Sequence, residues 1–232
     1  MSQFSQAHVA CPGCGDAVPF EAVHSVNGER APHLRQEILD ETFQRMACPA
    51  CAADFRLEPD FNYVDHAEKL WIAVLPLHLM SEWTLQEQRA ADLFKKVYVE
   101  GSPYLRGLAP TLRKRIVFGW AALREKLLID DLGLDDVTLE LVKSALIRSS
   151  EEAPLGQDSE LRLVAGTTDE LTFAWMDSQG EDLEELLSIE RREYAALAAD
   201  PEGRWTELRD DIAAGSFVDL NRLLAMPTAP HP

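Results

Sequence analysis

Residues 8–20, HVACPGCGDAVPF, place two cysteines around a Pro-Gly pair, and another glycine follows at once. Residues 44–57, QRMACPACAADFRL, repeat this pattern, and the two stretches together hold all four cysteines of the chain. A two-residue turn directs both sulfurs toward one point, and proline sets the φ angle with which the chain enters the turn. Four thiolates match tetrahedral zinc, at about 2.3 Å per Zn–S bond. The sequence therefore predicts one structural zinc ion, with the ligands Cys11, Cys14, Cys48 and Cys51.

The distance between the two cysteine pairs is the next constraint. They are separated by the 33 residues from 15 to 47, more than the shortest zinc-ribbon spacing, so we expect an inserted strand and helix to be looped out. Gly15 can take the positive φ that turns the chain away from the first pair. Ala52 occupies the corresponding position after the second pair, which predicts a slightly strained turn there.

Two other cysteine chemistries fit less well. A thioredoxin-like redox site needs one pair at the start of a helix, but GDAVPF after Cys14 is a poor helix former and a second pair is then unexplained. His66-Ala67-Glu68 matches the H-x-E fragment of zinc deaminases, but their signature places this fragment before the cysteines. The histidines are scattered, and His24 is the one closest in context to the cysteine pairs.

Composition limits the remaining possibilities. The chain has 232 residues, is 46% hydrophobic and carries a net charge of -18. The longest apolar stretch, LWIAVLPLHLM, is too short to span a bilayer, and the first residues lack the features of a secretory signal. We therefore expect a cytoplasmic protein without a membrane partner. Thiols stay reduced in that compartment, which favours metal binding over disulfides.

Charge is unevenly distributed along the chain. Residues 95–126 contain eight basic and two acidic residues, whereas residues 151–211 contain 18 acidic and five basic residues. The simplest interpretation of the basic segment is a solvated helix face that pairs with the acidic half. The alternative is a contact patch for a partner, although the net charge disfavours nucleic acid.

Hydrophobic periodicity predicts an α+β fold. Strands are expected at 17–27 and 69–76, and a short helix at 32–43. Helices are expected at 84–98, with a Thr84–Glu87 capping box and Leu93, Phe94 and Val97 on one side, at 110–132, and from Asp135 or Asp136 to residue 147. The helix at 110–132 would carry Leu112, Ile116, Trp120, Leu123 and Leu127.

The second half of the chain predicts a small α/β unit. A hairpin is expected at 160–176 with Leu171, Phe173 and Trp175 on one face, then helices at 189–200 and 202–215, and a last strand at 216–224. The predicted organisation is a zinc-ribbon-like domain at 1–80, a helical segment at 81–150, an acidic α/β region at 151–226 and a flexible tail at 227–232.

These residues resemble the CpXC family, bacterial proteins named for two C-P-x-C motifs. The resemblance includes ACPGCG, MACPACAADFRL, NYVDHAEKLWIAVLP and RIVFGWAALREKLLIDDLGLDDVTLELVKSAL, and it covers most of the first 148 residues. It implies that the four cysteines form a zinc-ribbon-like site, but it implies no established activity. Ala52 departs from the glycine that a knuckle often has.

The leading functional hypothesis is therefore a non-enzymatic zinc-binding adaptor that presents surfaces to a protein partner. A nucleic-acid-linked zinc ribbon that uses residues 95–126 is the first alternative. An enzyme is the second, because the abundant carboxylates do not single out a catalytic pair.

Overall fold

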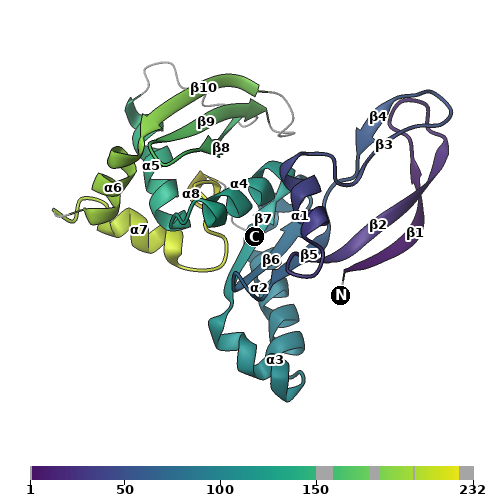
Figure 1. The fold of residues 1–232 in the computed structure, drawn as a ribbon, viewed down its shortest axis with the longest axis horizontal. Helices are drawn as coiled ribbons and strands as arrows, with labels where there is room; N and C mark the ends of the chain where they lie inside the picture. Colours follow the sequence, from purple (N-terminus) through teal and green to yellow (C-terminus); the bar gives the residue numbers. More distant parts are fainter. Residues whose placement is uncertain (1, 150–158, 178–182, 201, 225–232) are drawn as a thin grey trace, which may run out of the picture.

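The computed structural model describes residues 2–149, 159–177, 183–200 and 202–224, and it confirms the predicted α+β class (Figure 1). A five-stranded mixed sheet lies in the middle, with a three-stranded antiparallel sheet at one end and a small two-stranded sheet at the other. Helices lie between and below these sheets. None of the described helices has the length and apolar character that crossing a membrane requires.

The central sheet has the strand order β1-β2-β5-β6-β7. β2 pairs with β5 in parallel, as β6 does with β7, and the other neighbours are antiparallel. The strands are β1 (Gln3–Ala10), β2 (Ala17–Asn27), β5 (Phe61–Asp65), β6 (Leu70–Leu75) and β7 (Arg113–Phe118).

Helices cover the two faces of this sheet unequally. α1 (Pro32–Leu39) and α4 (Gly119–Asp131) pack on one face against residues such as Phe61, Tyr63 and Ile72. On the other face, α2 (Trp83–Phe94) packs on β6 and β7 through Trp71 and Phe118. Strand side chains alternate between faces, so β6 and β7 each supply residues to both cores.

The prediction of one helix over residues 110–132 is wrong in its first half. Residues 113–118 form β7, where consecutive residues Ile116 and Val117 are buried in the cores on opposite sheet faces. The helix begins only at Gly119, whose φ of +80° turns the chain out of the strand. The central sheet therefore includes β7, which lies beyond residue 80, where the predicted zinc-ribbon-like domain ends. Independent folding of the predicted domains stays a prediction.

The predicted capping box and apolar face of the helix at 84–98 are also wrong. Helix α2 begins at Trp83, after the 3-10 turn η1 (Leu77–Glu82), and no side chain caps it. Its buried side carries Gln86, Ala90 and Phe94, whereas Leu93 and Val97 are exposed. The chain continues through the π-helical turn η2 (Lys95–Val99), α3 (Pro103–Leu108) and the 3-10 turn η3 (Ala109–Thr111).

Most predictions for the second half are confirmed. α5 (Asp136–Ser149) begins after Asp135, whose carboxylate accepts a hydrogen bond from the Thr138 N–H at 2.8 Å. β8 (Ser159–Gly166) and β9 (Glu170–Asp177) form the hairpin, with Leu171, Phe173 and Trp175 in one core. The sequence missed β10 (Leu183–Glu190), which pairs with β9. The helices α6 (Arg191–Ala199) and α7 (Thr206–Ala213) follow.

The predicted last strand is wrong. Residues 215–220, which we call the C-terminal strap, have no regular structure and lead into α8 (Asn221–Leu224). Phe217 of the strap packs between Trp83 and Phe118, with ring centroids 5.7 and 5.1 Å away. The apolar residues that suggested a strand are thus explained by the burial of Phe217 against the central sheet, not by strand pairing. The predicted flexible tail, 227–232, lies outside the described residues.

Candidate metal centre

The four cysteines lie at the end of an arm that projects from the central sheet (Figure 1). The arm consists of the β1–β2 hairpin and the two-stranded sheet of β3 (Arg45–Ala47) and β4 (Asp54–Arg56). Each hairpin carries one cysteine pair in the turn between its strands. The inserted strand and helix that the spacing predicted are β2 and α1.

The two cysteine turns have the same backbone geometry. Cys11 N–H donates to the Asp16 carbonyl at 2.9 Å, and Gly15 N–H donates to the Cys11 carbonyl at 2.8 Å. In the second turn, Cys48 N–H donates to Ala53 and Ala52 N–H donates to Cys48, both at 2.8 Å. Such turns close tightly and leave the paired sulfurs on one side, as the sequence predicted.

The geometry of the sulfurs fits a tetrahedral cation. All four Sγ atoms lie within 4.8 Å of one another. The Sγ atoms of Cys11 and Cys51 are 3.7 Å apart, and those of Cys14 and Cys48 are 3.8 Å apart. A tetrahedron with bonds of about 2.3 Å has edges of about 3.8 Å, so the spacing matches a bound zinc ion. The Gly13 N–H also points at the Cys11 sulfur, at 3.3 Å.

The thiols of this cluster do not ionise independently. The backbone N–H of Cys14 lowers the pKa of Cys11 to about 7, and the N–H of Gly13 assists. The N–H of Asp16 also favours the thiolate of Cys14, but desolvation and the neighbouring thiols outweigh it and raise the pKa of Cys14 to about 12. Four thiolates at this spacing therefore need a cation between them.

Little apolar packing supports this end of the arm. Its small core contains Cys11, Val18, Cys48 and Phe55, with a few partly buried neighbours. No histidine joins the cysteine cluster in the described part of the chain. His24, the one histidine that the sequence singled out, instead hydrogen-bonds to Ser5 Oγ at 2.6 Å.

The strain that the sequence predicted at Ala52 is present. Ala52 has a φ of +60° and the corresponding Gly15 a φ of +79°. A Cβ added at Gly15 would have no atom within 4 Å, so a substitution there changes only the backbone preference. The left-handed conformation costs an L-residue about 1–2 kcal/mol.

These two positions give a matched pair of substitutions. Gly15→Ala is expected to lower the free energy of unfolding by about 1 kcal/mol, because it adds strain. Ala52→Gly is expected to leave it unchanged or to raise it by about 0.5 kcal/mol, because relief of strain is partly offset by the entropy of the unfolded glycine. Denaturant unfolding of both variants measures the difference. A Gly15→Ala variant as stable as the wild type would contradict this account.

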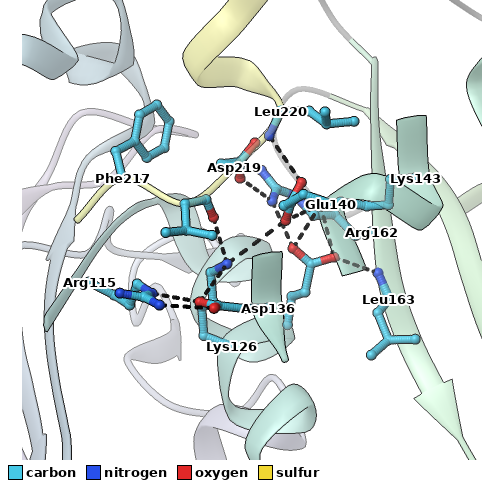
Figure 2. Close-up of polar contacts among 12 residues, drawn as sticks. Arg115, Lys126, Asp136, Glu140, Lys143, Arg162, Leu163, Phe217, Asp219 and Leu220 are labelled. Carbon is cyan, nitrogen blue, oxygen red and sulfur yellow. Dashed lines mark hydrogen bonds and ion pairs between the residues drawn. The ribbon is translucent and has the colours of Figure 1, made fainter. Parts of the chain in front are cut away.

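The structure also contains a cluster of buried charged side chains that the sequence did not reveal, where β7 and α4 meet α5, β8 and the C-terminal strap (Figure 2). Its ion pairs connect five carboxylates and four cations of the described residues into one network: Glu125, Asp136, Glu140, Glu160 and Asp219 with Arg115, Lys126, Lys143 and Arg162. These side chains come from β7, α4, α5, β8 and the C-terminal strap.

The C-terminal strap is held by this network. The Arg162 guanidinium donates a hydrogen bond to the Asp219 carboxylate at 2.5 Å. Lys126 Nζ donates to the Val218 carbonyl at 2.6 Å, and the Leu220 N–H donates to Glu140 at 3.0 Å (Figure 2). At the other end of the strap, Glu87 of α2 accepts the Phe217 N–H at 2.9 Å. The strap therefore ties α2, α4, α5 and β8 together.

Burial raises the pKa values of the carboxyl groups in this network, whereas pairing with cations lowers them. Burial alone would raise the pKa of Asp219, but Arg162 and Lys143 hold it below its usual range. Burial raises the pKa of Glu140 to about 7, because the negative charges of Asp219 and Glu125 add to the desolvation and together they outweigh Lys143 and Lys126. The void beside Arg162 has a volume of about 10 Å³, enough for one water molecule.

The basic segment at 95–126 is mostly engaged in internal ion pairs. Arg113 pairs with Asp130, Arg124 pairs with Glu41, and Arg115 and Lys126 belong to the buried network. Their partners in the described part of the chain are Glu41, Asp130, Asp136 and Glu140, so these cations pair within the chain but not with the acidic half that the sequence predicted. The charges of these four cations are therefore already compensated within the chain.

The fold and this site define an α+β protein with a four-cysteine centre built from two distant C-P-x-C turns. A family model described as "CpXC protein" matches residues 9–143. The chain belongs to the CpXC family. The match includes both cysteine turns and runs to Lys143 in α5, so Arg162 and Asp219 of the network lie beyond it. Comparison with curated proteins and with solved structures gave no match.

Proposed function

We propose that Cys11, Cys14, Cys48 and Cys51 bind one zinc ion and that this ion is structural. The observation that carries this proposal is the tetrahedral spacing of the four sulfurs, with edges of 3.7 and 3.8 Å. Four cysteine ligands leave no open coordination position, which is typical of structural and not of catalytic zinc. The small core beneath the turns supports the same role, because metal coordination then supplies folding free energy that packing does not.

Protein purified without chelator is expected to contain one zinc ion per chain. Elemental analysis by mass spectrometry measures the ratio, and growth medium that also contains iron and copper tests selectivity. The Cys11→Ser/Cys48→Ser variant should contain no bound zinc, because it loses one ligand from each turn. Well under half an equivalent in the wild type, or zinc retained by the double variant, would refute the assignment.

The proposed role of the whole chain is a non-enzymatic adaptor that presents surfaces to a protein partner. The projecting arm supports this role, because a metal site at its end stiffens two exposed hairpins (Figure 1). β1 is the outer strand of the central sheet, and its side chains are mostly exposed. Its free edge can take up an additional strand from a partner.

We also propose the cytoplasm of a bacterial cell as the location. Four thiols without a disulfide suit a reducing compartment, where they are available to a metal. Binding of short duplex DNA, measured at several salt concentrations, tests the nucleic-acid alternative. The internal pairing of the basic segment predicts only weak binding without sequence preference, whereas a steep salt dependence at specific sites would favour that alternative.

A further inference from the structure

Exposed large apolar side chains concentrate on one helical segment. Among the described residues, Leu85, Leu93, Val97, Val99 and Tyr104 are between 39 and 69% exposed. Only two others reach this class, Phe4 in β1 and Leu186 in β10. The five residues lie on α2, η2 and α3, and Figure 1 shows α3 projecting from the rest of the chain. Such a concentration on one element indicates a surface that becomes covered.

The arrangement of these residues on α2 favours another helix as the covering element. Leu85, Arg89, Leu93 and Val97 are spaced by four residues and form one ridge, while Trp83, Ala90 and Phe94 hold the adjacent side of α2 on the sheet. Ridges of this spacing pack into the grooves between the same ridges of a second helix, at a crossing angle near -50°.

The ridge borders a hollow in the surface. This hollow has a volume of about 370 Å³ and lies between α2 and the part of the sheet formed by β2 and β5. Arg89 and Leu93 of the ridge line it on one side, and His24 and Asn62 on the other. Gln86 also lines it, and its buried Nε2 atom has no hydrogen-bond partner in the described structure. The sheet face is therefore incompletely covered next to the ridge.

Charge determines which occupant fits. With a net charge of -18, most surfaces of two copies repel each other. Residues 85–97 are an exception, with three basic and two acidic residues. One of the two acids, Glu87, is already bound to the strap through the N–H of Phe217. Two copies can thus approach through α2 without the repulsion that their acidic surfaces would cause.

We propose that α2 is the contact surface of a homodimer, in which the α2 helices of two copies pack antiparallel through this ridge, about a two-fold axis midway between Arg89 and Leu93. This arrangement places Leu85 of one copy against Val97 of the second copy. It also places Arg89 at the level of Leu93 and Asp92 of the second copy. The ridge is thus complementary to itself in both apolar contact and charge, as an isologous interface requires. The proposal does not depend on the metal assignment.

Sedimentation velocity of the full zinc-loaded chain over a wide concentration range tests this dimer. The wild type is expected to dimerise, and Leu93→Glu/Val97→Glu is expected to raise the dissociation constant at least tenfold, because it buries two carboxylates per copy in the contact. Both residues are exposed, so the variant should keep the circular dichroism of the wild type. Leu186→Glu, at an exposed leucine on β10, is the control and should leave the dimer unchanged.

A charge exchange tests the antiparallel arrangement itself. Arg89→Asp alone is expected to weaken the dimer, and Arg89→Asp/Asp92→Arg to restore it, because the pair between copies is re-formed with reversed signs. A wild type that stays monomeric at all concentrations would overturn the proposal and leave a different protein as the occupant of α2. Dimers that persist in Leu93→Glu/Val97→Glu would overturn it as well, since the contact would then lie elsewhere.

Discussion

Replacing Arg162 with methionine is expected to lower the free energy of unfolding by about 3–5 kcal/mol, the cost of leaving a buried charge without its partner. Arg162 is only 2% exposed. It contacts Asp219 at 2.5 Å, Glu160 at 2.5 Å and Glu125 at 2.9 Å. Methionine fills a similar volume without charge, so the loss of stability measures the cost of leaving the buried carboxylates without this cation. Denaturant unfolding monitored by tryptophan fluorescence measures it.

The pH dependence of this loss follows from the sign of the carboxylate shifts. Arg162 lowers the pKa of Asp219 in the folded state, so its stabilisation is present above the unfolded pKa of about 3.9 and is lost as the pH falls through the folded value. The difference between the wild type and Arg162→Met is therefore expected to be full at pH 7 and to shrink below about pH 4. A difference that grows on acidification would contradict the proposed pairing.

Glu140→Gln is the matched control within the same network. The network has one carboxylate more than it has cations, and burial raises the pKa of Glu140 to about 7. Glutamine keeps an oxygen that accepts the Leu220 N–H, so the expected loss is only about 1 kcal/mol. Equal losses in Glu140→Gln and Arg162→Met would mean that the network contributes through packing and not through charge.

Removing the metal is the second change with a large expected effect. In isolated zinc-binding peptides the metal contributes on the order of 10 kcal/mol to folding. The end of the arm has only a small core. Treatment with a chelator is therefore expected to raise amide hydrogen exchange in residues 8–20 and 44–57 until their opening free energy is close to zero. β6 and α4 belong to the core on α1 and the central sheet and should stay protected.

Three outcomes of that experiment are distinguishable. Local loss of protection supports a structural metal whose effect is confined to the arm. Uniform loss of protection would mean that the arm and the central sheet unfold as one unit. No change after confirmed removal of zinc would mean that the cysteines do not support folding, and a redox role would then return. The Cys11→Ser/Cys48→Ser variant, which should not respond to the chelator, is the control.

The sequence by itself determined the cysteine centre, because its information is local. Two residues between cysteines close a turn whatever lies around it, and Gly15 and Ala52 take the positive φ that this turn needs. The hairpin of β8 and β9 was predictable for the same reason, since alternation at Leu171, Phe173 and Trp175 reports directly on a buried face. The α+β class followed from these local patterns.

Residues 113–118 were decided only by tertiary structure. Leu112, Ile116 and Trp120 are spaced by four, as on a helix, yet Ile116 and its neighbours pair with β6. The gain from completing the sheet and burying both faces exceeds a helix preference that is worth less than about 1 kcal/mol per residue. Spacing alone does not reveal that a partner strand is present 43 residues earlier in the chain.

The buried network was likewise invisible in the sequence. Glu125, Lys126 and Lys143 look like ordinary solvated charges on two amphipathic helices. They belong to a buried network in which Arg162 of β8 pairs with Glu125 and Asp219 of the C-terminal strap pairs with Arg162. A charge can leave water only where opposite charges and hydrogen-bond donors replace its hydration. Those partners come from segments far apart in the chain, so only the folded structure brings them together.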